Sequence, residues 1–147
     1  DASINLGQSN KVVTFFETTF CLPSALVDFI SIDVAFISLD KVLPVATTLL
    51  KDTGALVALI KPQFEAGKEN VGKGGIVRDP EIHKEVLHRI LQVAYDCGLY
   101  THGLTFSPIK GMEGNIEFLG YFKKYEEGAL SIDDFLIDTV VAEAHSL

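Results

Sequence analysis

The chain has 147 residues, of which 48% are hydrophobic and 22% charged, and this is typical of a globular domain with a buried core. Its apolar runs are no longer than strands, far short of the roughly 18 residues of a membrane helix, and its first 20 residues lack the pattern of a signal peptide. We therefore expect a cytoplasmic protein with no membrane partner. The net charge of −8 argues against a nucleic-acid surface, because Lys and Arg dominate phosphate binding.

The cysteines and histidines carry no recognisable chemistry. Cys21 and Cys97 lie outside any CxxC pattern, so we expect two reduced thiols. The four histidines lack the spacing of metal ligands, since His83 and His88 are five residues apart and share a helix face poorly. We assign no metal to this protein.

The amino-terminal third predicts a loop over residues 1–10 and a strand over residues 11–16, which are rich in β-branched and aromatic side chains. Residues 29–37 form a nearly continuous apolar run, which is typical of a strand covered on both faces. Residues 17–26 between them are ambiguous, with Pro23 breaking any regular element.

A helix is expected over residues 39–51, where apolar residues recur at helical spacing. Pro44 fits best in its first turn, and Gly54 suits the left-handed position that follows a helix. Residues 55–60 are the second buried strand, which ends at Pro62 because proline cannot donate to a sheet.

The second half begins with a long loop over residues 63–78, which contains four glycines. Asp79 caps a helix that starts at Pro80 and ends at Gly98. The remaining elements are two strands that we expect to pair as a hairpin and a final helix capped by Ser131. The strands cover residues 99–107 and 115–122, and Ile132, Phe135, Leu136, Val140 and Val141 are the apolar residues of the helix.

Strands that alternate with helices predict an α/β fold with a mostly parallel sheet, helices on both faces and one antiparallel strand near the edge. Ligands of such sheets lie beyond the carboxyl ends of the strands. Asp33 lies in one predicted strand, Lys61 ends another, and Glu117 lies in a third. Each of these side chains alone is more often a solvated strand-end charge than a catalytic group, but together they can converge at one rim.

The glycine-containing loop approaches the P-loop pattern but departs from it. Gly67 and Gly72-Lys73 have the required spacing, yet Gly74 stands where Ser or Thr is needed, and no helix follows directly. The loop instead gathers Lys68, Lys73 and Arg78 close to Lys61 in the sequence. This local positive charge suits a phosphate backbone, although a solubilising surface loop explains it about equally well.

Four segments together resemble one family. They resemble the C-terminal part of the TlyA, or hemolysin A, family, which carries an FtsJ-like methyltransferase domain. The resemblance implies a Rossmann-like sheet and methylation of ribose 2′-hydroxyls in ribosomal RNA with S-adenosylmethionine as cofactor. Its partners would be ribosomal RNA and a ribosomal subunit. The segments are SIDVAFISLDKVLP (31–44), ALIKPQFEAGKENVGKGGIVRDPEIH (58–83), GLTFSPIKGMEGNIEFL (103–119) and TVVAEAH (139–145).

The resemblance also assigns roles to residues. The wider family uses a Lys-Asp-Lys-Glu tetrad, whose Asp falls on Asp33, second Lys on Lys61 and Glu on Glu117. Asp33 and Val34 are then expected to contact the cofactor. The hydroxyl must lose its proton as it attacks the sulfonium methyl, and a lysine can stabilise the alkoxide or accept that proton. The two carboxylates would orient Lys61 and set its charge.

Several family features match nothing in residues 1–28. These are the first lysine of the tetrad, the glycine-rich cofactor loop and a small basic RNA-binding domain. Because the chain begins at Asp1 rather than Met, we expect residues 1–147 to be one partial methyltransferase domain, with a sheet incomplete at its N-terminal side and no activity alone. A non-catalytic RNA- or ribosome-binding remnant is the alternative. A cytolytic hemolysin is disfavoured, since the sequence shows neither an export signal nor an amphipathic membrane segment.

Overall fold

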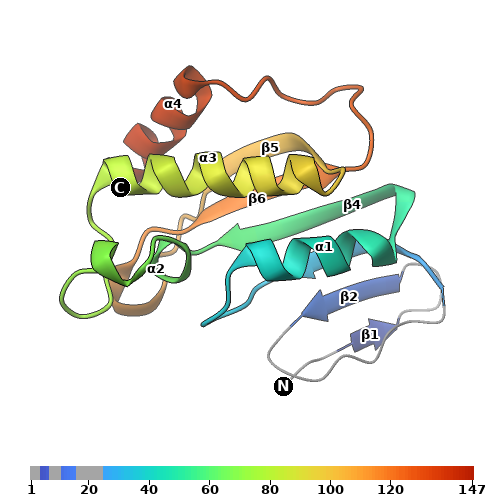
Figure 1. Cartoon of the computed structure of the whole chain (residues 1–147), viewed down its shortest axis with the longest axis horizontal. Helices are drawn as coiled ribbons and strands as arrows, with labels where there is room; N and C mark the ends of the chain where they lie inside the picture. The colour runs from blue at the N-terminus through green and yellow to red at the C-terminus, as the bar shows by residue number, and fades with distance from the viewer. Residues whose placement is uncertain (1–3, 7–10, 16–24) are drawn as a thin grey trace.

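The computed structural model of the chain describes residues 4–6, 11–15 and 25–147. Its strands form one sheet of six, in the order β1-β2-β3-β4-β6-β5. Strands β2, β3 and β4 run parallel, whereas β1 and β6 are antiparallel to their neighbours (Figure 1). The strand bounds are β1 Ile4–Leu6, β2 Lys11–Phe15, β3 Val27–Ile32, β4 Leu50–Ile60, β5 Tyr100–Phe106 and β6 Phe118–Lys123.

The strand predicted over residues 11–16 is confirmed as β2, which pairs with β3 on one side and with β1 on the other. Part of the predicted loop over residues 1–10 is therefore a short strand. Residues 17–24 of the ambiguous stretch lie outside the described part of the chain.

The two central strands have different limits from those predicted. Strand β3 ends at Ile32 rather than residue 37, and no strand could continue through Phe36, whose positive φ of 62° is incompatible with extended backbone. Strand β4 begins at Leu50, so Gly54 lies within a strand and does not cap a helix. Gly54 is needed there because a Cβ atom would lie 2.9 Å from the carbonyl oxygen of Asp28 on β3.

The first helix, α1 (Leu39–Leu49), is capped by Ser38, whose side chain accepts a hydrogen bond from the Asp40 backbone N–H. Pro44 is in its second turn, not in the first as predicted. The long helix α3 (Pro80–Asp96) begins at the predicted Asp79 cap, and Gly98 follows it with a φ of 87°. The capping pattern thus located α3 better than α1.

The predicted hairpin is confirmed, since β5 and β6 pair antiparallel. Strand β6 also pairs with β4, which leaves β5 at the edge. The last helix, α4 (Asp134–His145), is capped by Asp133 and not by Ser131. Its buried residues are Ile137, Val140, Val141 and Ala144, whereas Ile132 and Phe135 are exposed.

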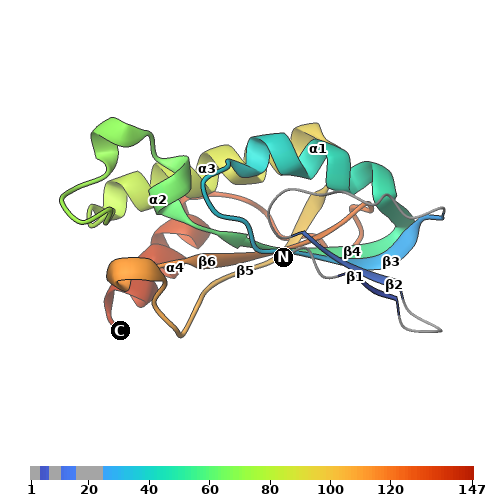
Figure 2. The ribbon, with the colours of Figure 1, turned by 90° about the horizontal axis from the view of Figure 1, so that it is seen from below.

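The apolar stripes of α1 and α3 cover one face of the sheet, and the short α2 (Pro62–Glu65) lies on the same side (Figure 2). Helix α4 packs against α3 and β5. We expected helices on both faces of the sheet, and in the described part of the chain α1, α2 and α3 lie on the same face. Residues of the other face, such as Val57 and Leu119, are half-buried. No described helix combines the length and apolar character needed to cross a membrane.

The fully buried His83 of α3 connects the helical layer to the loop before it. Its Nε2 atom donates to the Val77 carbonyl oxygen at 3.0 Å, so its Nδ1 atom accepts from His145 Nε2 of α4 at 2.9 Å. The pKa of His83 is lowered, mainly because burial disfavours the imidazolium and also because His145 is near. The Val77 hydrogen bond and Asp79 act in the opposite direction.

This lowered pKa predicts a loss of stability in acid. The unfolded chain takes up a proton near the ordinary pKa of 6.5, which the folded chain resists, so the stabilisation is complete above that pH and is lost as the pH falls below it. We expect His83→Gln to flatten the decline in unfolding free energy between about pH 7 and about pH 5. Urea titrations of wild type, His83→Gln and the half-exposed control His88→Gln measure this. An unchanged slope in His83→Gln would contradict the prediction.

Candidate functional site

The residues that we predicted to be catalytic lie at one edge of the sheet. Asp33 follows the end of β3 and Lys61 follows the end of β4. Glu117 directly precedes β6, which is antiparallel and pairs its first residue, Phe118, with Ile60. The carboxyl ends of β3 and β4 and the amino end of β6 therefore meet at the same edge.

Lys61 and Asp33 form a direct ion pair. Lys61 Nζ is 2.5 Å from Asp33 Oδ1, and the side chains are 15% and 48% exposed. Lys61 also occupies the N-cap position of α2, so the helix start fixes its backbone directly after the strand. This arrangement holds a largely buried ammonium group beside a carboxylate that solvent and ligands can reach.

Glu117 is 7% exposed and forms no ion pair with Lys61 within 4.0 Å. Its Oε1 atom instead accepts a hydrogen bond from Gln63 Nε2 at 3.0 Å. The backbone of Gly111 lies against this carboxylate, since a Cβ atom there would come within 2.0 Å of Glu117 Oε1. Sequence reasoning missed Gln63, although its position two residues after Lys61 was a usable signal.

A second buried carboxylate, Glu65, fixes the elements around the site. It accepts hydrogen bonds from Ser38 Oγ at 2.6 Å, from the Leu39 backbone N–H at 2.8 Å and from Arg89 Nη2 at 2.8 Å. The ends of α1 and α2 and the middle of α3 are thereby joined. Glu65 does not face the predicted catalytic groups directly, so we interpret it as structural.

The predicted loop over residues 63–78 is more regular than expected, because it begins with α2 and contains a short 3-10 turn at Lys68–Asn70. The buried Asn115 ties it to the neighbouring loop. Its Oδ1 atom accepts from the Val77 N–H at 3.0 Å, and its Nδ2 atom donates to the carbonyl oxygens of Gly75 at 2.9 Å and Met112 at 3.0 Å. A single amide thus places the basic loop beside Glu117.

The predicted RNA-binding residues Lys68, Lys73 and Arg78 are all exposed, and none forms an ion pair with a described residue. Lys110, in the loop that Asn115 ties to them, is also exposed. Positive charge therefore gathers at the edge of the sheet that carries Lys61.

An exposed aromatic ring stands at the same edge. Phe36 is 76% exposed, and its ring packs against Phe64 of α2 with 4.9 Å between centroids. A positive φ is strained for a bulky residue, and such strain often marks functional positions. The sequence offered no signal for this conformation, because apolar neighbours made Phe36 look like part of a strand.

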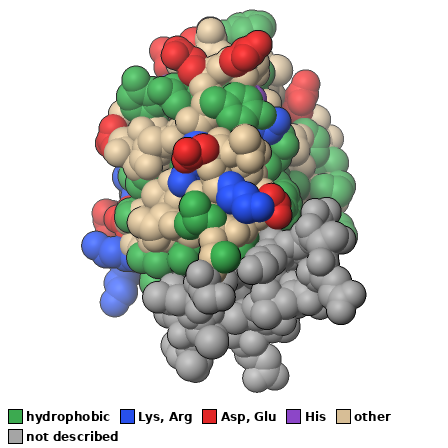
Figure 3. Space-filling model, turned by 90° about the vertical axis from the view of Figure 1, so that its right-hand side faces the viewer, with side chains coloured by type: hydrophobic (Ala, Val, Ile, Leu, Met, Phe, Trp, Pro, Cys, Tyr) green, Lys and Arg blue, Asp and Glu red, His purple; other side chains and the backbone are tan. Residues whose placement is uncertain are grey.

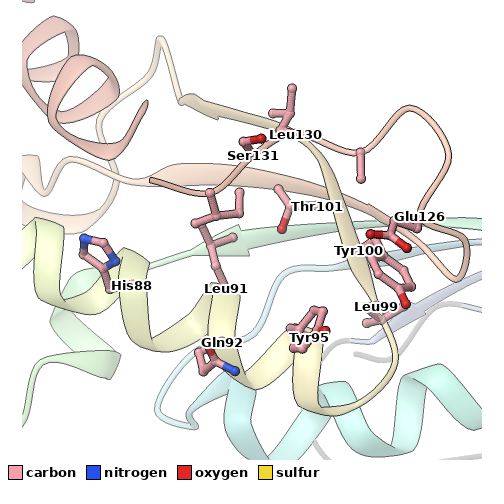
Figure 4. Close-up of a pocket in the computed structure, with 12 residues that line it drawn as sticks. His88, Leu91, Gln92, Tyr95, Leu99, Tyr100, Thr101, Glu126, Leu130 and Ser131 are labelled. Atoms are coloured by element: carbon pink, nitrogen blue, oxygen red, sulfur yellow. The ribbon is translucent and has the colours of Figure 1, made fainter. Parts of the chain in front are cut away.

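A hollow of about 480 Å³ lies away from this site. It opens between α3, the start of β5 and the segment before α4, with Tyr95, Tyr100 and Leu91 among its walls (Figure 4). Figure 3 shows the end of the molecule opposite Lys61. Acidic, basic and hydrophobic side chains are mixed on this face. Within the described ranges, no three His, Cys, Asp or Glu side chains gather as a metal site.

The comparison with protein families decides the classification. The model of the FtsJ-like methyltransferase family matches residues 6–124, which contain β2 to β6 and all three predicted catalytic residues. The chain belongs to the FtsJ-like methyltransferase family. The resemblance inferred from the sequence is confirmed.

Curated relatives of this FtsJ-like chain include Bacillus subtilis YqxC, which is 45% identical over 95% of the chain and 53% of its own length. Brachyspira hyodysenteriae Hemolysin A is 43% identical over 69% of the chain and 40% of its own length. The 16S/23S rRNA (cytidine-2′-O)-methyltransferase TlyA of Mycobacterium tuberculosis is 36% identical over 71% of the chain and 39% of its own length. The chain thus spans about half or less of these relatives.

Two solved structures of proteins with a hemolysin name share the fold of this FtsJ-like chain. The one from Streptococcus thermophilus has a TM-score of 0.76 and 48% identity, over 83% of this chain and 44% of that one. The one from Lactococcus lactis has a TM-score of 0.75 and 44% identity, over 84% and 58%.

The role of Asn115 in this FtsJ-like domain can be tested by its removal. We expect Asn115→Ala to lower the unfolding free energy by about 2 kcal/mol, because it leaves the buried Val77 N–H without a partner. Limited proteolysis should also become faster between Lys68 and Arg78. The control is Asn70→Ala, which removes one half-buried hydrogen bond to the Ala66 carbonyl. Equal effects of the two substitutions on stability and cleavage would argue against a special role for Asn115.

Proposed function

We propose that this chain is the methyl-transferring part of an S-adenosylmethionine-dependent RNA 2′-O-methyltransferase that acts on ribosomal RNA. The observation that carries the proposal is the ion pair of Lys61 with Asp33 at the carboxyl edge of the sheet, with Glu117 held beside it. Family membership and the activity for which the Mycobacterium tuberculosis relative is named support the same reaction. We also propose that residues 1–147 belong to one methyltransferase domain and that the protein works in the cytoplasm on a ribosomal subunit.

The residues at this edge fit part of the cofactor. S-adenosylmethionine supplies a methyl group on a positively charged sulfonium. Asp33 offers a half-exposed carboxylate, and the exposed ring of Phe36 lies three residues further on, both of which suit a cation. Asp33 and Val34, directly after β3, would hold it where ligands of open α/β sheets bind.

Lys61 would act on the ribose 2′-oxygen. Its ammonium is mostly shielded from water, so its charge is felt more strongly there than at an exposed site. Nζ would donate to the oxygen and offset its growing negative charge as the oxygen attacks the methyl carbon and the hydroxyl proton passes to solvent water. Asp33 holds Nζ in position through their ion pair.

The surroundings of the site suit RNA despite the net charge of −8. The exposed Lys68, Lys73, Arg78 and Lys110 can contact phosphates, and the ring of Phe36 offers a face on which a base can stack. The proposed phosphate-binding charge is therefore local to these loops, whereas the net charge of −8 belongs to the chain as a whole.

The first test removes the ammonium of Lys61 in the full-length protein that contains this chain. We expect Lys61→Met to lower the transfer of labelled methyl from S-adenosylmethionine to ribosomal RNA by at least about 100-fold, because charge stabilisation of the alkoxide is lost. The matched control is Lys51→Met, which removes the ion pair of Lys51 with Asp28 at the other end of β4.

Circular dichroism establishes that both variants are folded. Normal turnover of folded Lys61→Met would remove this lysine from the mechanism. RNA binding without methyl transfer by the wild-type protein would instead favour the non-catalytic remnant.

The second test concerns the basic loop. We expect Lys73→Glu to raise the KM for RNA by about 10-fold with little change in kcat. The slope of the logarithm of the binding constant against the logarithm of the salt concentration should also become shallower by about one, because one fewer counterion is released on binding. Lys123→Glu, at the far end of β6, is the control. Filter binding and steady-state kinetics at several salt concentrations measure both effects, and equal responses of the two variants would refute a phosphate contact at Lys73.

A further inference from the structure

The site contains a hydrogen-bonding group that the proposed mechanism leaves unused. Gln63 follows Lys61 by two residues in α2, and its Nε2 atom contacts Glu117. Its Oε1 atom is buried and has no hydrogen-bond partner in the described part of the chain. A buried acceptor without a donor costs free energy, and one that lies two residues from the proposed catalytic lysine calls for an explanation.

The orientation of the Gln63 amide follows from the charge of Glu117. A carboxylate can only accept hydrogen bonds, so the amide must present its NH₂ group to Glu117 and turn its oxygen away. The close approach of Gly111 also leaves little room for water at Glu117 Oε1. Among the described side chains, Gln63 is the hydrogen-bond donor to this buried carboxylate.

The donor for Gln63 Oε1 can come from Lys61. An ammonium group carries three N–H donors, and Asp33 is its ion-pair partner among the described residues. We propose that Gln63 is a positioning residue that links Glu117 to Lys61, with its nitrogen on Glu117 and its oxygen accepting from Lys61 Nζ. A rotation of the Lys61 side chain that keeps Asp33 within reach completes this bond.

The link would organise the site as one chain of contacts, from Asp33 through Lys61 and Gln63 to Glu117. It explains how Glu117 can influence Lys61 without a direct ion pair. The ammonium is then held from two sides, which restricts the direction in which it can meet the ribose oxygen. This inference rests on the proposed function for its catalytic consequence, but the hydrogen bonds themselves can be tested without turnover.

The kinetic test uses Gln63→Leu in the full-length protein. We expect kcat to fall by about 10- to 30-fold, with the KM values for RNA and S-adenosylmethionine within about 2-fold of wild type. The matched control is Gln92→Leu, which removes an amide–carboxylate hydrogen bond between Gln92 and Asp96 on the surface of α3.

A double substitution asks whether Gln63 acts through Glu117. If it does, Gln63→Leu should lower kcat by less than about 2-fold in a Glu117→Gln background, because the link is already impaired. Independent, multiplicative losses would overturn the proposal, as would a normal kcat in folded Gln63→Leu. A rise in the KM for RNA with normal kcat would also overturn it, since Gln63 would then bind substrate.

A measurement without turnover separates this proposal from the proposed function. In NMR spectra, the side-chain amide of Gln63 should shift in Lys61→Met and in Glu117→Gln but not in Lys51→Met. These shifts support the link even if the protein transfers no methyl group, a result that would overturn only the proposed function. An amide of Gln63 that is insensitive to Lys61→Met would overturn the link even in an active enzyme.

Discussion

The buried carboxylate of Glu65 is the interaction on which the arrangement of the site depends. Its side chain is only 2% exposed, and an uncompensated charge at such a position would be very costly. The hydrogen bonds from Ser38, Leu39 and Arg89 compensate that charge and tie α1, α2 and α3 to one point. The segment after β3 and the segment after β4 are thereby fixed relative to each other. The contact of Asp33 with Lys61 follows from this constraint.

The charged groups around the site fall into a buried set and a solvent-exposed set. Glu117 and Glu65 are buried and bound by neutral or cationic donors, whereas Asp33 and the basic loop are open to solvent. Buried groups can orient a neighbour but cannot meet a large substrate, and exposed groups can do both. This division suits a reaction on a large polyanion, and it reconciles local phosphate binding with a net charge of −8.

Much of the fold could be predicted from local signals. The Asp79-Pro80 pair marked the start of α3, and the apolar run at residues 55–60 marked the buried part of β4, because capping and burial act within a few residues. The misplaced limits of β3 and α1 have the opposite cause. The backbone of Phe36 and the close approach of Gly54 to Asp28 depend on neighbours that are distant in the sequence.

The sequence by itself determined the family, the parallel sheet and the candidate residues Asp33, Lys61 and Glu117, since residue types and spacings survive in a linear chain. Tertiary structure alone decided which of these residues touch. It paired Lys61 with Asp33, and it gave Glu117 a neutral partner in Gln63. The register of β4 against β6 and the course of α2 set these contacts. Such distances come from the packing of whole elements, which no local pattern encodes.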